Sequence, residues 1–237
     1  MILTPSEQNP FMVQELSEKD VTFLQSRSFK NFNTMIGIPT RGMIHYQILT
    51  CWRTLMMPMN SRINHTFAAG FEVGDARNNL VQQFLADKHL KYLMFFDDDI
   101  LMKPESFLKL ARAFSETDYD ILGGIYRLKD GSRQQVAYRR SEDGYMESIT
   151  DDDMLPEKGN VIDLDIIGMG FTCIKRSVLE KVEAPWFRTS DLEEISSGQS
   201  FTEDVFFCRK AKEAGFKIGA VPSITLGHLD TKSGIVY

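Results

Sequence analysis

The sequence predicts an α/β fold in which a mainly parallel sheet carries helices on both faces. Short apolar runs alternate with stretches of helical periodicity from about residue 34 onward. Several of these runs, such as "KYLMFF" at 91–96, are continuously apolar, which is typical of strands buried on both faces. A chain of 237 residues is also long enough to bury the core of one such domain.

Strands and helices alternate through the first half of the chain, with turn or capping residues between them. The run "TMIGIP" is apolar and β-branched and stops at Pro39. Asp75 is placed to cap a helix. The apolar stripe of that helix is Ala76, Leu80, Val81, Phe84 and Leu85. In chain order we expect a strand at 34–39, a helix at 43–57 ended by Pro58, a strand at 63–71, the helix capped by Asp75, a strand at 91–96, a helix from Pro104 to about Phe114, and a strand at 119–124.

The second half of the chain begins with a segment of weak periodicity. Polar residues dominate from Gly131 to Asn160, which suggests a hairpin or a loop over the sheet. Residues 1–30 are also polar and form an N-terminal extension, or a helix lying on the single domain at 31–237. The remaining expected elements are a strand and then a helix within 161–182, a helix from its cap Thr202 through Ala214 with Gly215 at its end, and short strands at 217–221 and 223–228.

The composition is that of a soluble globular protein, with 43% hydrophobic and 25% charged residues. No apolar run approaches the roughly 20 residues that span a bilayer, and the N-terminus has no basic leader before an apolar stretch. Cys51, Cys173 and Cys208 are odd in number and widely spaced, which favours a reducing compartment. We therefore expect a cytoplasmic protein without a membrane span. The net charge of −6 argues against a role that depends on non-specific nucleic-acid binding.

Three consecutive carboxylates, Asp97, Asp98 and Asp99, follow the predicted strand at 91–96. Ligands of open parallel sheets bind beyond the carboxyl ends of the strands, where this triplet is expected to lie. Neighbouring carboxylates raise each other's pKa unless a cation offsets their repulsion. A hard divalent ion, Mg²⁺ or Mn²⁺, would do so, and it commonly keeps waters and substrate phosphates as further ligands. The alternative is an acidic turn that simply follows a strand.

Two other charged segments carry weaker signals. The second acidic triplet, at 151–153, lies among polar residues near Pro156, as in a solvated loop. The segment "YRLKDGSRQQVAYRR" at 126–140 is rich in arginine and lysine, and Arg127 is its first basic residue. It is either a solvated hairpin face or a surface that binds an anionic substrate.

Three stretches resemble a known family when they are taken in order. These are "IGIPTRG" near the start, "YLMFFDDDI" about sixty residues later, and "FTEDVFFCRKAKEAGFKI" followed by "GH" near the end. Together they resemble the GT-A-fold glycosyltransferases, and most closely the family-2-like group, over roughly residues 33–230. The resemblance implies a Rossmann-like nucleotide-diphospho-sugar transferase fold, with one catalytic domain at 31–237 after the extension.

The resemblance also implies a donor site for a nucleotide sugar of the UDP or GDP type. The end of the first strand contacts the nucleotide base in that family, which here implicates Thr40 and Arg41. Arg77, in "GDARNN" at a helix start, is a candidate for contacting the nucleotide or the leaving group, and a surface arginine is the alternative.

The DxD carboxylates of the family bind the ribose and a divalent metal ion. Carried over, this gives Asp97 and Asp99 as the pair, with Asp99 as the expected metal ligand. Three acids in a row leave the register uncertain by one residue, so Asp98 can exchange roles with either neighbour. A later histidine completes the metal site in several such enzymes, and His228 in "TLGHLD" matches that position. The expected ion is Mn²⁺ or Mg²⁺.

Glu203 and Asp204 stand at the start of a predicted helix, where acids also complement the helix dipole. A carboxylate at hydrogen-bond distance from an acceptor hydroxyl suits the role of general base. The resemblance favours Asp204 over Glu203 for that role, because inverting members commonly use the second acid of this pair. A retaining enzyme would not need the base.

The acceptor side is less well defined by the sequence. Trp186 could stack on a sugar face, or it could be a core residue, and Arg127 is a weak candidate for an anionic acceptor. The polar stretch 187–200 suits a mobile acceptor loop. The glycines of "IGMGF" at 167–171 allow either a close approach to a ligand or close strand packing.

The expected function is metal-dependent transfer of a sugar from a nucleotide-sugar donor to an acceptor hydroxyl. Glycans, small molecules, proteins and a modified DNA base all stay open as acceptors. One alternative is a non-catalytic module that binds a nucleotide sugar or a metal ion. A second is a phosphohydrolase of the haloacid dehalogenase type, which would carry its Asp-x-Asp on the first strand.

Overall fold

The protein is described here from a computed structural model. The residues that it describes are 16–26, 31–57, 61–155, 160–198 and 200–237. Four of the expectations above fall partly outside these ranges: the N-terminal extension (1–15 and 27–30), the helix stop at Pro58, the polar segment (156–159) and the acceptor loop (residue 199).

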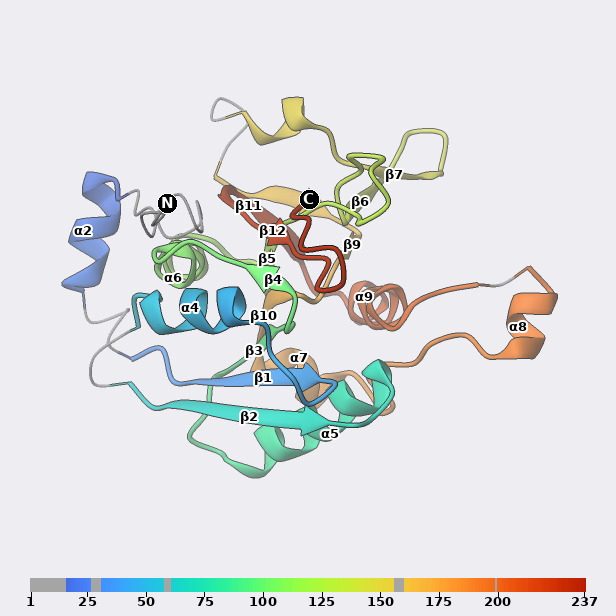
Figure 1. Ribbon diagram of the computed structural model, residues 1–237, viewed down its shortest axis with the longest axis horizontal. Coiled ribbons are helices and arrows are strands. Elements are labelled where there is room, and N and C mark those ends of the chain that lie inside the picture. Colours follow the sequence, from blue (N-terminus) through green and yellow to red (C-terminus); the bar gives the residue numbers. More distant parts are fainter. Residues whose placement is uncertain (1–15, 27–30, 58–60, 156–159, 199) are drawn as a thin grey trace.

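A seven-stranded sheet forms the centre of the molecule (Figure 1). Three of its neighbouring pairs are parallel, and five of the seven strands run in the same direction. The predicted mainly parallel sheet is therefore confirmed. Across the sheet the strands are β2 (Ile63–Ala69), β1 (Thr34–Thr40), β3 (Tyr92–Phe96), β10 (Phe171–Lys175), β5 (Ile121–Ile125), β11 (Ile218–Thr225) and β8 (Ile162–Leu164), of which β10 and β8 run opposite to the others.

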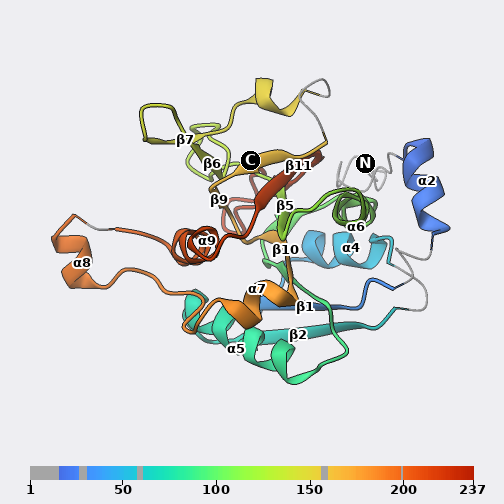
Figure 2. The ribbon, with the colours of Figure 1, turned by 180° about the vertical axis from the view of Figure 1, so that it is seen from behind.

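Helices cover both faces of this sheet, as the sequence predicts. One layer holds α4 (Tyr46–Thr54) and α6 (Ser106–Glu116), with α2 (Glu18–Leu24) packed on α6 (Figure 1). The other layer holds α5 (Val73–Ala86), α7 (Arg176–Lys181) and α9 (Glu203–Glu213), seen in front in Figure 2. Each layer buries its own apolar cluster against the sheet, so the core has two parts, one on each face.

The N-terminal helix α2 is joined to the domain by both apolar and ionic contacts. Phe23 packs into the apolar cluster beneath α6, and buried Asp20 pairs with Arg112 at 3.4 Å. The described part of the N-terminal segment is therefore a helix lying on the domain, which is one of the two forms expected for it.

Three helix starts differ from the positions expected from the sequence. The cap of α5 is Glu72 and not Asp75, because the Glu72 carboxylate accepts from the amides of Gly74 and Asp75 at 2.7 and 3.3 Å. α4 is shorter than 43–57, since the His45 ring caps it and its last residue is Thr54. α6 begins at Ser106, two residues after Pro104.

The end of the chain also differs from the expectation of two short strands at 217–221 and 223–228. A single strand, β11, runs through Pro222, and its pairing with β5 shifts register between Ala220 and Thr225. Proline has no amide to donate, so a ladder interrupted at this point accommodates it. β12 (Gly227–His228) then pairs with β4 (Ile100–Leu101) in a separate two-stranded sheet.

The polar segment after residue 131 contains the expected hairpin. β6 (Ala137–Arg140) pairs with β7 (Met146–Ser148) and with β9 (Ile166–Ile167), and the 3₁₀ turn η2 (Asp151–Met154) follows. The segment expected to be an acceptor loop instead carries a short helix, α8 (Leu192–Ser196), on an arm that extends away from the sheet (Figure 1).

Candidate functional site

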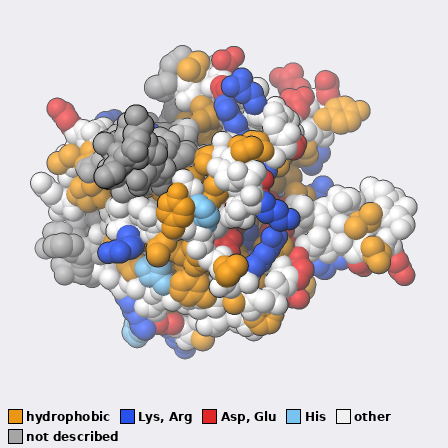
Figure 3. Space-filling view, in the orientation of Figure 1, with side chains coloured by type: hydrophobic (Ala, Val, Ile, Leu, Met, Phe, Trp, Pro, Cys, Tyr) orange, Lys and Arg blue, Asp and Glu red, His pale blue; other side chains and the backbone are white. Residues whose placement is uncertain are grey.

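The candidate site lies where β1 and β3 end, at the same edge of the sheet. These strands are parallel neighbours, so Thr40 at the end of β1 lies near the three aspartates that follow β3. A cleft of about 1030 Å³ opens at this edge. Figure 3 shows the hollowed face, on which acidic and basic side chains lie close together. The lining residues are Pro39, Thr40, Arg41, Met43, Ile44, His45, Phe71, Glu72, Val73, Ala76, Asp97, Asp98, Asp99, Lys129, Asp230, Thr231 and Lys232.

Asp98 is held by the end of the first strand. The Thr40 hydroxyl donates to its carboxylate at 2.6 Å, and the Gly42 amide donates to the Thr40 oxygen at 3.1 Å. Arg41 is exposed on the wall of the same cleft. The structure therefore brings Asp98 to the adjacent residues Thr40 and Arg41, although Asp98 lies 58 positions after Thr40 in the sequence.

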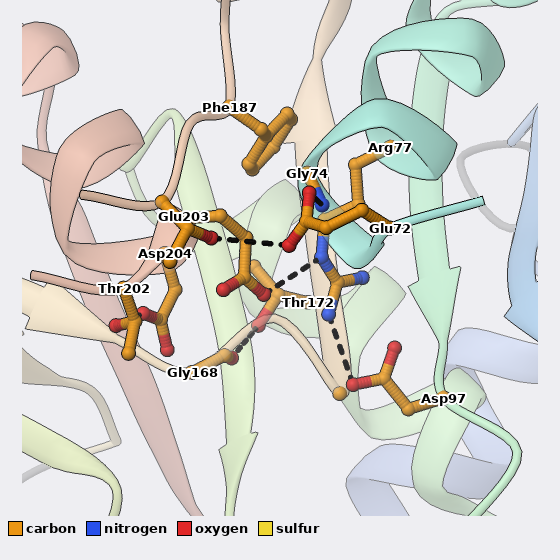
Figure 4. Close-up of polar contacts among 12 residues, drawn as sticks. Glu72, Gly74, Arg77, Asp97, Gly168, Thr172, Phe187, Thr202, Glu203 and Asp204 are labelled. Atoms are coloured by element: carbon orange, nitrogen blue, oxygen red, sulfur yellow. Dashed lines mark hydrogen bonds and ion pairs between the residues drawn. The ribbon is translucent and has the colours of Figure 1, made fainter. Parts of the chain in front are cut away.

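Asp97 is held by Arg77, which is 2% exposed and is not the surface arginine that the sequence left open. Its guanidinium lies 3.0 Å from Asp97 and 3.3 Å from Glu203, over the ring of Phe95 (Figure 4). Burial lowers the pKa of Arg77, but the charges of Asp97 and Glu203 outweigh that effect and raise it. Arg77 thus stays charged and joins the aspartate triplet to the first turn of α9.

The two carboxylates on Arg77 are themselves perturbed by burial. Desolvation raises the pKa of Asp97, and the contact with Arg77 offsets this only in part. Desolvation likewise raises the pKa of Glu203, with Arg77 again opposing and the charge of Asp204 adding to the rise. One buried cation therefore serves two carboxylates, and neither is fully compensated.

Asp99 meets two different groups, Lys129 and His228. The Lys129 ammonium lies 2.5 Å from Asp99 Oδ2, and His228 Nε2 lies 3.7 Å from the same oxygen. Burial would raise the pKa of Asp99, but the contacts with His228 and Lys129 prevail and lower it. The register of β12 on β4 sets His228 opposite Ile100, which explains how a residue so late in the chain reaches the triplet.

The histidine is oriented so that Nε2 is available to a ligand. Its Nδ1 lies 2.7 Å from the carbonyl oxygen of Arg127. A carbonyl can only accept, so Nδ1 carries a proton, and Nε2 lies on the side of Asp99. Metal-binding histidines are commonly oriented in this way.

The donor set of the site suits a hard divalent ion in its chemistry. Asp97 and Asp99 supply oxygens and His228 supplies a nitrogen, and Asp97 Oδ1 is buried without a hydrogen-bond partner within the described residues. These three side chains are, however, not arranged around a common metal position. The described ranges contain no cluster of three acidic, histidine or cysteine side chains poised around one metal position. The cation at Asp99 is instead the ammonium of Lys129.

Asp204 lies at the first turn of α9, outside the residues that line the cleft. Its Oδ1 accepts from the Val205 amide at 2.8 Å and from the Thr202 hydroxyl, so Thr202 holds the acid and does not cap the helix with its side chain. Burial raises the pKa of Tyr126, and the charges of Asp97 and Asp204 raise it further, which places the phenol within electrostatic range of both.

Two predicted acceptor residues are engaged elsewhere. Trp186 is 8% exposed, and its indole N–H donates to the Leu179 carbonyl at 3.0 Å, so it packs in the core. The Arg127 guanidinium binds both oxygens of Asp151 at 3.0 Å. The second acidic triplet, at 151–153, thus lies at the surface, and its first residue, Asp151, is bound to Arg127 of the basic segment at 126–140.

The glycines of "IGMGF" serve close packing, which is one of the two roles left open by the sequence. A Cβ at Gly168 would lie 2.1 Å from the Tyr126 hydroxyl, and one at Gly170 would lie 2.8 Å from Ile100 Cγ1. The sequence analysis also missed several residues that line the cleft. Lys129 was visible there only as one of several basic residues in a segment, and the other missed residues include His45, Phe71 and Lys232.

Comparison with solved structures identifies the fold. A197 from STIV has a TM-score of 0.58 at 22% identity, over 86% of this chain and 92% of that chain. The crystal structure of GalNAc-T7 with UDP, GalNAc and Mn²⁺ has a TM-score of 0.55 at 10% identity, over 83% of this chain and 44% of that chain. The fold is therefore that of the GT-A glycosyltransferases, as the sequence predicts.

The family follows from the sequence of the chain. Residues 62–235 match the family described as glycosyltransferase like family 2, and the chain belongs to it. The protein is accordingly a glycosyltransferase, and neither the binding module nor the phosphohydrolase is supported. No curated protein sequence matches the chain significantly. Among the described residues, no helix has the length and apolar character needed to cross a membrane.

Proposed function

We propose that the protein transfers a sugar from a UDP- or GDP-sugar to an acceptor hydroxyl, with Mn²⁺ or Mg²⁺ at the aspartate triplet. The observation that carries this proposal is the distribution of partners along the triplet. Asp97 faces Arg77, Asp98 faces Thr40, and Asp99 faces Lys129 and His228; all three carboxylates line a large cleft. Each carboxylate thus has a different neighbour, and together they offer oxygens for both a ribose and a metal ion.

The cleft accommodates a nucleotide sugar in both size and chemistry. Its volume of about 1030 Å³ is at the upper end of the range for pockets that bind small molecules. Thr40 and Arg41 at the end of β1 are proposed to contact the base, and Asp97 and Asp98 the ribose. Arg77 is buried behind Asp97, so we assign it a role in orienting that carboxylate and not in touching the nucleotide.

Asp99 and His228, with Asp97, would hold the divalent ion. When bound, the ion supplies positive charge to the diphosphate as negative charge develops on it. The partial exposure of Asp99 and the position of His228 Nε2, 3.7 Å from Asp99 Oδ2, support this assignment. The presence of Mn²⁺ in the GalNAc-T7 structure supports it for the GT-A fold in general.

The transfer step needs a base on the acceptor side, and we assign that role to Asp204. Its carboxylate takes the proton of the acceptor hydroxyl while the acceptor oxygen bonds to the anomeric carbon. The bond from that carbon to the phosphate oxygen breaks, and the nucleoside diphosphate leaves with the electron pair. Displacement from the opposite face inverts the configuration. Glu203, fixed on Arg77, positions the first turn of α9 for this step.

The acceptor stays among glycans, small molecules, proteins and modified DNA bases. The arm that carries α8 returns to the body immediately before α9, so we propose that acceptors approach between this arm and Asp204. Trp186 and Arg127 receive no acceptor role, because their polar groups are bound to Leu179 and Asp151.

The test is turnover of nucleotide-sugar donors. The protein is incubated with UDP- and GDP-sugars, Mn²⁺ and a panel of hydroxyl acceptors, and nucleotide release is measured with and without EDTA. We expect release with at least one donor and its loss in EDTA. Turnover that is unaffected by EDTA would contradict the role of the metal, and no turnover with any donor would contradict the proposal as a whole.

A further inference from the structure

The cation that contacts Asp99 in this structure is a lysine of the protein itself. Lys129 Nζ lies 2.5 Å from Asp99 Oδ2, so the two groups form an ion pair in direct hydrogen-bond contact. The two side chains are 30% and 28% exposed, and both line the cleft. The pair is therefore neither sealed in the core nor a fully solvated surface contact.

Lys129 is carried by a loop whose base is fixed and whose tip is exposed. Asp151 binds Arg127 on one side of the base and Gln135 on the other, at 3.0 and 2.9 Å. The tip turns through Gly131 and is exposed to solvent. A lysine side chain has a flexible four-carbon stem, so its ammonium can move away from Asp99 while the base of the loop stays in place.

The two cations of the triplet differ in their freedom to move. Arg77 is 2% exposed and bridges Asp97 to Glu203, so it is locked in place. Lys129 faces the open cleft and is bound to a single carboxylate. An incoming divalent ion needs the oxygen that Lys129 covers, and a nucleotide sugar brings a diphosphate into the same cleft. The divalent ion therefore competes with Lys129 for Asp99, and the diphosphate is an alternative partner for the Lys129 ammonium.

We propose that Lys129 is an exchangeable counter-ion of the donor site, which holds Asp99 in the donor-free protein and binds the donor's diphosphate once a divalent ion takes Asp99. The proposal rests on the donor site proposed above and assigns one of its specificity-determining residues. It predicts that a single side chain weakens metal binding and strengthens diphosphate binding. A merely structural ion pair would produce neither effect on its own.

The first measurement is Mn²⁺ affinity in the absence of nucleotide, by isothermal titration calorimetry. Lys129→Met keeps an unbranched side chain of similar length and removes its charge, and it is expected to bind Mn²⁺ about tenfold more tightly, because one charge-assisted hydrogen bond no longer competes. Lys129→Arg restores a competing cation and is expected to bind Mn²⁺ nearly as wild type does. Lys232→Met is the matched control, since Lys232 lines the same cleft while the ion pairs of Asp99 involve Lys129 and His228.

The second measurement is the affinity for UDP and GDP in saturating Mn²⁺. Lys129→Met is expected to bind the nucleoside diphosphate about tenfold more weakly, which is opposite in sign to its effect on Mn²⁺. Thermal unfolding of each variant accompanies both titrations. The proposal is supported if Lys129→Met unfolds at the same temperature as the wild type, binds Mn²⁺ more tightly and binds the nucleoside diphosphate more weakly.

The outcomes separate this proposal from the proposed function. Equal Mn²⁺ affinities for wild type, Lys129→Met and Lys232→Met would overturn the counter-ion role and leave the donor site intact. Equal diphosphate affinities would overturn the transfer of Lys129 to the donor. If wild type and Lys129→Met both fail to bind Mn²⁺, the proposed metal site fails, and the role of Lys129 fails with it.

Discussion

At the scale of single residues, three adjacent carboxylates are tolerated because each has its own neighbour. Asp97 lies on a buried arginine, Asp98 accepts from a threonine hydroxyl, and Asp99 lies on a lysine. The arrangement leaves the pKa of Asp97 raised by burial and that of Asp99 lowered, so the two ends of the triplet differ in their electrostatics. A site of this kind is expected where charge is to be exchanged with a ligand.

The role of Asp204 gives the first prediction. Asp204→Asn removes the base but keeps a hydrogen-bonding side chain of the same shape, so transfer is expected to fall about 10²- to 10⁴-fold. Donor binding should be unchanged, because Asp204 is not among the residues that line the cleft. Single-turnover transfer and UDP or GDP titration measure the two quantities. Asp152→Asn, in the exposed second triplet, is the control, and wild-type transfer by Asp204→Asn would disprove the assignment.

The second prediction concerns the pH dependence of stability through Glu203. Burial raises the pKa of Glu203 above its ordinary value of 4.5, against the opposing charge of Arg77. A carboxyl with a raised folded-state pKa contributes stability that is full below the unfolded pKa and is lost as the pH rises through the folded pKa. The wild type should therefore lose this contribution as the pH rises above 4.5, whereas Glu203→Gln should not.

Urea unfolding of both proteins across this pH range measures the effect. The free energy of unfolding of Glu203→Gln minus that of wild type should increase with pH, whatever its sign at the acidic end. Glu213→Gln, at an exposed position near the end of the same helix, is the control and should give a flat difference. A flat or falling difference for Glu203→Gln would contradict the raised pKa.

Sequence reasoning at this scale selected candidate residues from local patterns, and the resemblance to the family gave them their expected roles. The triplet follows a buried strand, Glu203 and Asp204 open a helix, and His228 follows a late strand, and all of these are local patterns. It could not assign Lys129 or decide between the two interpretations of Arg77. Their roles arise from contacts across 30 and 126 positions of sequence, to Asp99 and Glu203, and no local pattern encodes such contacts.

At the scale of elements, the turn between β9 and β10 determines how closely Tyr126 can approach. Gly168 leaves room for the Tyr126 hydroxyl, which accepts from the Gly170 amide at 3.2 Å, and the Tyr126 ring packs edge-on against His228. The turn therefore packs against Tyr126, and the Tyr126 ring in turn contacts His228, a predicted metal ligand.

The third prediction follows from that packing. Gly168→Ala would place a methyl group 2.1 Å from the Tyr126 hydroxyl and 2.7 Å from Val136 Cγ1, so we expect a loss of about 1–3 kcal/mol in the free energy of unfolding. Chemical denaturation measures it. Adding Tyr126→Phe, which removes the clashing oxygen, should recover part of the loss. An unchanged free energy of unfolding for Gly168→Ala would contradict this prediction, because it would mean that the turn has space for a methyl group.

The fourth prediction concerns the loop that carries Lys129. Asp151→Asn weakens the anchor formed with Arg127 and Gln135, so the amide of Leu128, which donates to Gln134 at 3.0 Å, should exchange hydrogen faster. Asp152→Asn removes a neighbouring charge that lies outside this anchor and should leave the exchange unchanged. Hydrogen exchange measured by mass spectrometry compares the two variants. Equal exchange would mean that the loop is held by other contacts.

Several elements could be predicted from the sequence, and the exceptions have physical causes. Continuous apolar runs marked β1, β3 and β5 correctly, because their burial on both faces requires it. The start of α5 was misplaced because Glu72 and Asp75 are both able to cap, and their sequence order does not decide between them. β11 was split because Pro222 is a strand breaker in general, while here it lies where the ladder is interrupted.

At the scale of the whole molecule, the sheet order explains why the site forms where it does. β1 and β3 are central parallel neighbours, and β12 returns from the end of the chain to pair beside the triplet. Helices on both faces leave the carboxyl edge of the strands as an open side for a ligand. The alternation of strands and helices predicted this architecture, whereas the antiparallel insertion of β10 and the arm with α8 carried no signal in the sequence pattern.

The central claim is that this edge binds a nucleotide sugar's diphosphate through a divalent ion on Asp99. The measurement that tests it most directly is the affinity for UDP and GDP with Mn²⁺ and with EDTA, in wild type and in Asp99→Asn. We predict that Mn²⁺ tightens binding to wild type about tenfold or more and that Asp99→Asn loses this enhancement. Equal affinity in Mn²⁺ and EDTA for wild type, or an undiminished enhancement in Asp99→Asn, would contradict the account.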